Sequence, residues 1–330
     1  MSLRIGMIGA GTMAQDHAAA LAEVAGARLV AVADPLLERT QAMAARHDAT
    51  AYADYRDLLD GVEAVWICTP PFLHREQAET CAAAGKHLFV EKPLALTVAD
   101  CRAIIAAARQ HRVQLMVGQV FRFYPVFQEA FRRFEAGDLG DLVTCWSTRM
   151  GYHPPSTMPA WRTDPALSGG FTIENQVHEI DFVTWFGGEP VAVQGTVLRS
   201  SPEFPALDNG MSALITYRNG ARGQVYGSWL SHIWTAQRGL VGTRGTIVIE
   251  AWDRLRYGGA GAVSREDEEI VTVAGPSGAV RAEDEHFLHC IERDELPLVT
   301  GEIGMRAVEV ARATIISSDA NRPVTLPLAY

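Results

Sequence analysis

The sequence predicts an α/β protein of two domains, in which a doubly wound parallel sheet is followed by an open, mostly antiparallel β-sheet with a few helices. Two observations lead to this prediction. Up to about residue 120, short apolar runs alternate with helical segments, whereas from Leu142 onward strand-like segments follow one another through turns. The 330 residues are also enough for two separate cores. We therefore expect one domain over residues 1–120 and a second over residues 121–330.

The composition argues against several classes of partner. The formal net charge is −10 and there is no long basic run, so we expect no nucleic-acid partner, because such proteins cluster their Lys and Arg. No apolar run approaches about 20 residues and no signal-peptide pattern occurs, so we expect a cytoplasmic protein without membrane contact. The five cysteines lack metal-ligand spacing, and we expect neither a metal site nor a disulfide. They are Cys68, Cys81, Cys101, Cys145 and Cys290.

The first domain alternates strands with helices in chain order. The expected strands are Leu3 to Ile8, Arg28 to Ala33, "EAVWICTP", "HLFVEKP" and Gln114 to Gly118. The expected helices run from His17 to Val24, up to about His47, from His74 to Ala84 and from Asp100 to Gln110. Each apolar run is short and nearly continuous, as in parallel strands that are buried on both faces.

The turn "GAGTMA" after the first strand has the spacing of a dinucleotide-binding loop. Gly9 permits a tight turn, Gly11 lets the backbone approach a pyrophosphate, and Ala14 completes the G-x-G-x-x-A pattern. Asp34 ends the second strand, where a carboxylate accepts hydrogen bonds from the adenosine ribose and repels a 2′-phosphate. We therefore expect a Rossmann domain that binds NAD in preference to NADP, although Arg39 follows about one helical turn later. An alternative role for Asp34 is the N-cap of the next helix.

Polar residues also follow two later strands. Ligands bind beyond the carboxyl ends of the strands in such sheets, and these ends carry Thr69 with Pro70, and Glu91 with Lys92 and Pro93. A lysine between a buried strand and a proline is held in a restricted backbone, so we interpret Lys92 as a positioned group near the nicotinamide. The alternative is an ordinary surface lysine.

The second domain contains consecutive strand-like segments with Asn-Gly and Arg-Gly turns, as in an antiparallel sheet. These segments are "LVTCWSTRM", "AVQGTVLR", "MSALITYRNG", "ARGQVYGSWL" and "AQRGLVGTRGTIVIEAW". Further helices are expected from Arg122 to Glu135, from Arg281 to Glu292 and from Glu302 to Ser318.

One helix within this domain carries a polar stripe. The segment "SGGFTIENQVHEIDFVTWFGGEP" offers Thr172 as an N-cap, and helical spacing places Glu174, His178 and Asp181 on one face. Apolar residues flank this face, so its polar groups need partners or a function. A buried histidine satisfied by carbonyl groups is the alternative for His178. The preceding loop "GYHPPSTMPAWRTDP" supplies aromatic and hydrogen-bonding side chains suited to a hydroxylated ligand.

Together the glycine turn with Asp34, "CTPPFLH", "EKP", "VGQVFRFYP", "WR…SGG…E-x-x-x-H-x-x-D" and "RPVTLPL" resemble the Gfo/Idh/MocA family, that of glucose-fructose oxidoreductase and inositol dehydrogenase. The resemblance covers nearly the whole chain and implies a catalytic set of Lys92, His178 and Glu174, although many members have Asp at the position of Glu174. The implied cofactor-binding residues are Gly9, Gly11, Thr12, Met13, Asp34, Thr69, Pro70, His74, Glu91, Lys92 and Gln119. The implied substrate-binding residues are Lys92, Arg122, Tyr152, Trp161, Arg162, Asn175, His178 and Asp181.

The resemblance further implies an NAD(P)-dependent oxidoreductase that transfers a hydride between nicotinamide and a hydroxyl or carbonyl carbon of a sugar, inositol or related cyclic polyol. His178 would take the hydroxyl proton and Lys92 would stabilise the developing alkoxide; the sequence leaves open which of the two moves the proton. Two other functions remain open: an isomerase or glycoside hydrolase that returns the hydride to the same sugar, and a non-catalytic sensor. The second domain is expected to bind substrate and to form a homodimer or homotetramer through its sheet.

Overall fold

The computed structural model describes residues 2–329, which form two compact units. The first unit contains the chain up to Val120 together with Gly278–Met305, and the second contains Phe121–Ser277 and the chain from Arg306 onward. The sequence-based division differs from this in residues 278–305, which were assigned to the second domain. They join the first unit because α10 (Ala279–Arg293) packs against α1 (Thr12–Leu21).

The first unit is built on a six-stranded parallel sheet with the strand order β3-β2-β1-β4-β5-β6. Its strands are β1 (Leu3–Ile8), β2 (Ala27–Ala33), β3 (Thr50–Tyr52), β4 (Ala64–Ile67), β5 (His87–Glu91) and β6 (Leu115–Gly118). Its other helices are α2 (Leu37–His47), α3 (His74–Ala83), α4 (Val98–His111) and the 3₁₀ turns η1 (Tyr55–Gly61) and η2 (Pro71–Leu73). This order is that of a doubly wound dinucleotide-binding sheet and confirms the predicted fold class.

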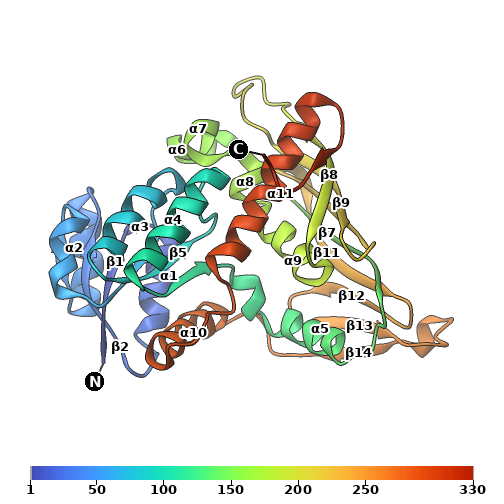
Figure 1. The fold of residues 1–330 in the computed structure, drawn as a ribbon, viewed down its shortest axis with the longest axis horizontal. Helices are drawn as coiled ribbons and strands as arrows, with labels where there is room; N and C mark the ends of the chain where they lie inside the picture. Colours follow the sequence, from blue (N-terminus) through green and yellow to red (C-terminus); the bar gives the residue numbers. More distant parts are fainter. Residues whose placement is uncertain (1, 330) are drawn as a thin grey trace. The chain divides into compact units, whose positions relative to one another are not determined.

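The central strands are buried along nearly their whole length, as their continuous apolar runs predict. Every residue of β4 and of β6 is buried, and so are the last four residues of β1 and of β5. Figure 1 shows the helices that cover the sheet, with α3 beside α4 and α1 beside α10. The carboxyl ends of β1, β2, β4 and β5 therefore meet at one edge of a rigid sheet.

Two local predictions for the first unit are wrong. The first helix begins at Thr12, directly after the glycine turn, and not at His17, because Gly11 serves as its N-cap. The strand β3, of three residues, and the 3₁₀ turn η1, of seven, were not predicted, since segments this short carry too little periodicity to be recognised.

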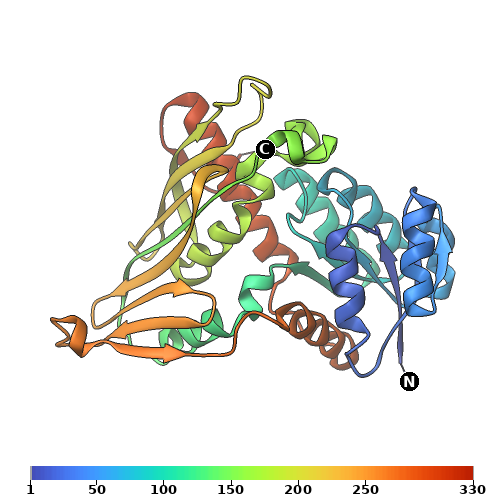
Figure 2. The ribbon, with the colours of Figure 1, turned by 180° about the vertical axis from the view of Figure 1, so that it is seen from behind.

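The second unit is built on a nine-stranded sheet with the order β14-β13-β12-β11-β7-β10-β9-β8-β15. These strands are β7 (Leu142–Tyr152), β8 (Pro190–Leu198), β9 (Gly210–Tyr217), β10 (Arg222–Ser228), β11 (Leu230–Gly242), β12 (Thr246–Ala251), β13 (Arg254–Gly258), β14 (Glu269–Thr272) and β15 (Val324–Thr325). Neighbours are antiparallel except β7 and β10, so the predicted open, mostly antiparallel sheet is confirmed. Figure 2 shows the orange strands of residues 246–272 at one edge.

Helical segments join and flank the strands of this unit. They are η3 (Val120–Phe123), α5 (Pro125–Glu135), η4 (Pro155–Thr157), α6 (Ala160–Thr163), α7 (Pro165–Ser168), α8 (Gly170–Glu174), α9 (Val177–Gly187), η5 (Arg265–Asp267) and α11 (Gly301–Ala320). Helix α9 lies on β7 and β10. The expected single helix after Gly169 is wrong, because the chain forms α8 and α9 with a break at Asn175 and Gln176. The backbone N–H of Gln176 donates to Phe171 O, five residues back, and this interrupts the regular helical ladder.

Candidate active site

The glycine turn after β1 has the backbone that a dinucleotide needs. Gly9 has φ +101°, and a Cβ on it would lie 2.8 Å from Cys68 O, so only glycine fits this position. Gly11 faces open space, since no atom of residues 2–329 comes within 4 Å of a Cβ built on it. Gly9 therefore brings β1 and β4 close together, and Gly11 leaves room for a ligand against the backbone.

The N-terminus of α1 follows this turn and is open to an anion. Its N-cap, Gly11, provides no side-chain hydrogen bond, and the next two residues, Thr12 and Met13, are exposed. The first N–H groups of a helix lack partners within the helix and carry partial positive charge. The turn and α1 thus fit the pyrophosphate of a dinucleotide, which would supply a hydride acceptor or donor.

Asp34 ties the end of β2 to this turn. Its Oδ2 accepts a hydrogen bond from the backbone N–H of Ala10 at 2.9 Å, and its Oδ1 accepts one from the N–H of Leu36 at 2.8 Å. The alternative role as N-cap is wrong, because α2 begins at Leu37 and its N-cap is Leu36. Each carboxylate oxygen keeps a second lone pair, so the geometry is compatible with hydrogen bonds from ribose hydroxyls.

His74 holds two loops at the sheet edge together. Its Nε2 lies 2.8 Å from Thr69 O and its Nδ1 lies 3.0 Å from Pro93 O, so the imidazole links the loops after β4 and β5. The side chain is fully buried, and burial lowers its pKa. Both ring nitrogens face the protein's own carbonyl groups, and the contact of His74 with the cofactor stays a prediction. Pro70 lies between Thr69 and η2, and Gln119 is buried directly after β6.

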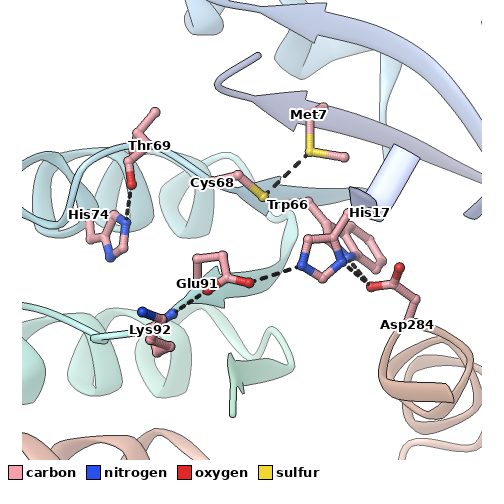
Figure 3. A network of polar contacts seen from close by, with 9 residues as sticks. All are labelled: Met7, His17, Trp66, Cys68, Thr69, His74, Glu91, Lys92 and Asp284. Carbon is pink, nitrogen blue, oxygen red and sulfur yellow. Dashed lines mark hydrogen bonds and ion pairs between the residues drawn. The ribbon is translucent and has the colours of Figure 1, made fainter. Parts of the chain in front are cut away.

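Glu91 and Lys92 follow from the end of β5. One carboxylate oxygen of Glu91, Oε2, accepts a hydrogen bond from the backbone N–H of Lys92 at 2.9 Å, and the other, Oε1, lies 3.0 Å from His17 Nε2 (Figure 3). Lys92 is half-buried, and Pro93 after it is bound through its carbonyl to His74. Lys92 is thus held in a fixed backbone at the carboxyl end of the strand, as its position in the sequence indicates.

In the second unit His178 lies near the start of α9, with 9% of its surface exposed. Its imidazole stacks on the ring of Phe121, with centroids 4.7 Å apart and planes at 21°. Sequence reasoning did not single out Phe121. The signal available was the aromatic segment "VFRFYP", whose contact with His178 depends on chain folding over 57 residues.

Glu174 and Arg162 form an ion pair, in which the guanidinium Nη2 lies 2.9 and 2.8 Å from the two carboxylate oxygens. Glu174 is buried at the end of α8, while Arg162 on α6 is partly exposed and lies over the ring of Trp229. The two predicted residues are therefore brought together, but Glu174 does not share a continuous helix with His178 as expected.

Arg122 and Asp181 were expected to contact substrate, and the structure binds them to each other instead. Two guanidinium nitrogens lie 2.8 and 2.9 Å from the two carboxylate oxygens, and both side chains are buried. A buried charge of this kind is directed at its counter-charge, and the contact of either residue with substrate stays a prediction.

The remaining predicted substrate residues lie in different surroundings. Tyr152 is half exposed at the end of β7 and stacks on His232 with centroids 4.1 Å apart. Trp161 is half-buried on α6. Asn175 is buried between α8 and α9, where its Oδ1 accepts a hydrogen bond from Gln176 Nε2 at 3.0 Å.

An aromatic cavity of about 360 Å³ lies within the second unit. Trp234, Trp252 and Arg238 are among its lining residues, and Gln237 and Glu250 add polar groups. Trp252 contacts the ring of Phe121 at 5.6 Å, and Phe121 stacks on His178, so aromatic rings connect the cavity wall to the histidine. No residue of this cavity was predicted, because its members come from β11 and the end of β12 and have no common motif.

Comparison with known proteins gives matches over both units. Residues 3–119 match the model described as "Oxidoreductase family, NAD-binding Rossmann fold", and residues 127–248 match the model described as "GFO/IDH/MocA C-terminal domain". The chain is 31% identical over 352 residues to inositol 2-dehydrogenase 1 of Saccharopolyspora erythraea, and the alignment covers 100% of this chain and 98% of the relative.

A second relative is named for a different activity. The chain is 27% identical to a 2,7-anhydro-N-acetylneuraminate hydratase of Mediterraneibacter gnavus, with 95% of this chain and 92% of the relative aligned. Among solved structures, levoglucosan dehydrogenase in complex with NADH superposes with a TM-score of 0.92 over 100% of both chains at 23% identity. The structural match shows that the fold is shared.

Proposed function

Because this chain belongs to the Gfo/Idh/MocA oxidoreductase family, we propose that it is an NAD-dependent dehydrogenase that oxidises a CH–OH group of a sugar, inositol or related cyclic polyol. The observation that carries the proposal is that one chain has both the open glycine turn and the positioned Lys92. This chain also aligns over its whole length with an inositol dehydrogenase.

In the proposed reaction His178 accepts the proton of the substrate hydroxyl, and its stacking on Phe121 holds the imidazole plane. Lys92 is the proposed hydrogen-bond donor that stabilises the negative charge developing on the substrate. A nicotinamide coenzyme held by the glycine turn and the start of α1 would supply the hydride acceptor. Glu174, paired with Arg162, supplies negative charge beside the α8–α9 break that precedes His178.

The proposed substrate class is supported by the side chains of the second unit. Two tryptophans and four polar residues are among the residues that line the cavity, whose wall contacts Phe121, the stacking partner of His178. A ring of CH groups edged by hydroxyls offers an apolar face to aromatic rings and an edge of hydrogen-bonding groups to polar side chains. Tyr152, Trp161 and Asn175 stay proposed substrate contacts of the same unit.

The test is to incubate the protein with NAD and a panel of inositols, aldoses and anhydrosugars while following reduced nicotinamide at 340 nm. Lys92→Ala and His178→Ala should each lower kcat at least about 100-fold, within the range of acid–base and electrostatic contributions. The sequence has one other lysine, Lys86 before β5, whose Nζ donates to Val62 O. Lys86→Ala is therefore the matched control and should keep its kcat within twofold. Absence of turnover with every member of the panel would contradict the proposal.

The similarity to the hydratase of Mediterraneibacter gnavus favours a second function. In this alternative the protein retains NAD, removes a hydride from the sugar and returns it to the same molecule, so no free NADH accumulates. Product analysis by mass spectrometry in the same panel distinguishes the two, because a substrate would change without absorbance at 340 nm.

The proposed assembly is a homodimer or homotetramer through the sheet of the second unit. One face of the sheet exposes Leu198, Leu214 and Tyr226, from the neighbouring strands β8, β9 and β10. Apolar side chains gathered on a sheet face favour burial against a second copy. Leu214→Glu should reduce the mass measured by light scattering to that of a monomer, and an unchanged mass would contradict this assembly. We place the protein in the cytoplasm, and no helix among residues 2–329 is both long and apolar enough to cross a bilayer.

A further inference from the structure

Three charged side chains meet in the core of the first unit, far apart in the sequence. His17 on α1 has no exposed surface, its Nδ1 lies 2.8 Å from Asp284 Oδ1 and its Nε2 lies 3.0 Å from Glu91 Oε1 (Figure 3). The indole N–H of Trp66 donates to the same Asp284 Oδ1 at 2.8 Å. The proposed mechanism uses none of His17, Trp66 and Asp284.

The two carboxylates fix the charge of the imidazole. A neutral imidazole has one donor and one acceptor, whereas both ring nitrogens of His17 face carboxylate oxygens, which fits the doubly protonated ring. Burial alone lowers the pKa of His17, but Asp284 and Glu91 raise it well above the ordinary value. Glu283 of α10 lies near this cluster, and burial raises the pKa of its carboxyl well above the ordinary value. Burial also raises the pKa of the Cys68 thiol well above its ordinary value.

The cluster continues directly to the proposed active site. Glu91 Oε1 contacts His17, while its Oε2 accepts the backbone N–H of Lys92 at 2.9 Å, so both oxygens are in use. Gly118 on β6 leaves the space for this carboxylate, since a Cβ there would lie 3.0 Å from Oε1. His17 therefore fixes the orientation of the Glu91 carboxylate, and this carboxylate in turn holds the backbone N–H of Lys92.

We propose that His17 and Asp284 are positioning residues for the reaction: through Glu91 they fix the backbone of Lys92 and so place its amine against the substrate oxygen. This rests on the role proposed for Lys92. Asp284 holds the imidazole, the imidazole holds Glu91, and Glu91 holds the first peptide group beyond β5. A displacement of about 1 Å at a catalytic group is enough to lower a rate about 100-fold.

Glu283 offers a matched control for this proposal. It lies next to Asp284 on α10 and is equally buried, yet neither of its carboxyl oxygens has a hydrogen-bond partner within residues 2–329. A loss of activity that follows Asp284 but not Glu283 separates positioning from a general effect of altering a buried carboxyl group. Gly118→Ala provides a second, charge-neutral way to displace the Glu91 carboxylate.

The experiment compares His17→Gln, Asp284→Asn, Gly118→Ala and Glu283→Gln in the full chain, at a temperature well below the Tm of each. For His17→Gln and Gly118→Ala we expect kcat to fall at least tenfold, with KM for the polyol and Kd for NADH within twofold of wild type. Asp284→Asn should have a smaller effect in the same direction, because a neutral imidazole can still donate to Glu91. Glu283→Gln should leave all three constants within twofold.

A purely structural role would lower Tm without lowering kcat, and such a result for His17→Gln overturns the proposal. A loss of NADH affinity in proportion to kcat also overturns it, because it would place the cluster in cofactor binding. If His17→Gln fails to fold, the same two criteria apply to Gly118→Ala.

A second readout does not need turnover. The chain has two lysines, so the ratio of Lys92 to Lys86 modified by an amine-acylating reagent can be measured by mass spectrometry. The ratio should change at least threefold in His17→Gln and remain within 1.5-fold in Glu283→Gln. If wild type oxidises no polyol, the proposed function fails while this ratio still decides the positioning role; an unchanged ratio in His17→Gln contradicts it.

Discussion

The guanidinium of Arg122 and the carboxylate of Asp181 form a bidentate ion pair, with Nε 2.8 Å from Oδ2 and Nη2 2.9 Å from Oδ1. The pair joins η3 to α9, and it is flanked by the two members of the aromatic stack. Arg122 directly follows Phe121, and Asp181 lies three residues after His178 on the same helix. The ion pair therefore fixes the two segments whose side chains stack on each other.

We predict that Asp181→Ala destabilises the protein by about 3–5 kcal/mol, because it leaves a buried guanidinium without its counter-charge. The free energy of unfolding in urea measures this. Arg218→Ala is the control, since Arg218 pairs with Glu189 at 2.6 Å on the exposed surface, and such pairs contribute about 0–1 kcal/mol. Equal losses of unfolding free energy in the two variants would show that the buried Arg122–Asp181 pair stabilises the protein no more than an exposed pair does.

Replacing Phe121 by Leu should lower kcat by about threefold to tenfold, because the imidazole of His178 loses its stacking partner. An aromatic pair contributes about 0.5–1.5 kcal/mol beyond burial, and 1.4 kcal/mol corresponds to a factor of about ten. Steady-state kinetics on the best substrate of the panel give the value. Phe134→Leu removes a ring that packs at 5.4 Å on Phe186 in the same unit and should leave kcat unchanged. A loss of similar size in Phe134→Leu would show that the effect of Phe121 is not specific.

Glu283→Gln should stabilise the protein at pH 7.5 and have almost no effect at pH 4. Burial raises the pKa of the Glu283 carboxyl in the folded state, so the folded chain holds a proton that the unfolded chain has lost. The stability from this group is complete below the unfolded pKa and declines as the pH rises toward the folded pKa. Glutamine does not titrate, so the variant lacks this decline.

Thermal denaturation of wild type and Glu283→Gln between pH 4 and pH 8 measures the difference. We expect the Tm of the variant to exceed that of wild type by at least about 2 °C at pH 7.5, a shift that corresponds to about 1.4 kcal/mol for a chain of 330 residues. A constant difference across the pH range would show that the pKa of Glu283 is not raised in the folded state.

Asp34→Ala should raise the ratio of kcat/KM for NADP to that for NAD at least tenfold, because the carboxylate that repels the 2′-phosphate is removed. The variant also loses the hydrogen bonds to the N–H groups of Ala10 and Leu36, so a lower Tm is expected. Asp48→Ala, at an exposed C-cap, is the control for coenzyme preference. An unchanged ratio in Asp34→Ala would show that Asp34 acts only in holding the glycine turn.

Features that depend on neighbouring residues were predictable from the sequence. The parallel sheet followed from continuous apolar runs, and the dinucleotide turn followed from the spacing of Gly9 and Gly11. The position of Lys92 at the end of β5 followed from the run before it and the proline after it. Each of these depends on backbone sterics and on burial within a few residues, which the order of residues specifies directly.

The partners of the polar side chains were decided by tertiary structure. His17 was not singled out from the sequence. It lies on the buried stripe of α1 with Ala14, Ala18 and Leu21, where a polar group needs a partner. That partner is Asp284, 267 residues away, and no local pattern identifies it. Arg122 and Asp181 likewise look like ligand-binding groups in the sequence and are a buried ion pair in the structure.

The sequence by itself thus indicated five of the six strands of the parallel sheet, the place of the coenzyme turn, and the lysine and histidine for which a catalytic role is proposed. Only the tertiary structure decided which charges neutralise one another, and the reason is physical. A buried charge must meet a counter-charge within hydrogen-bond distance, and the folding of the whole chain determines which one is near.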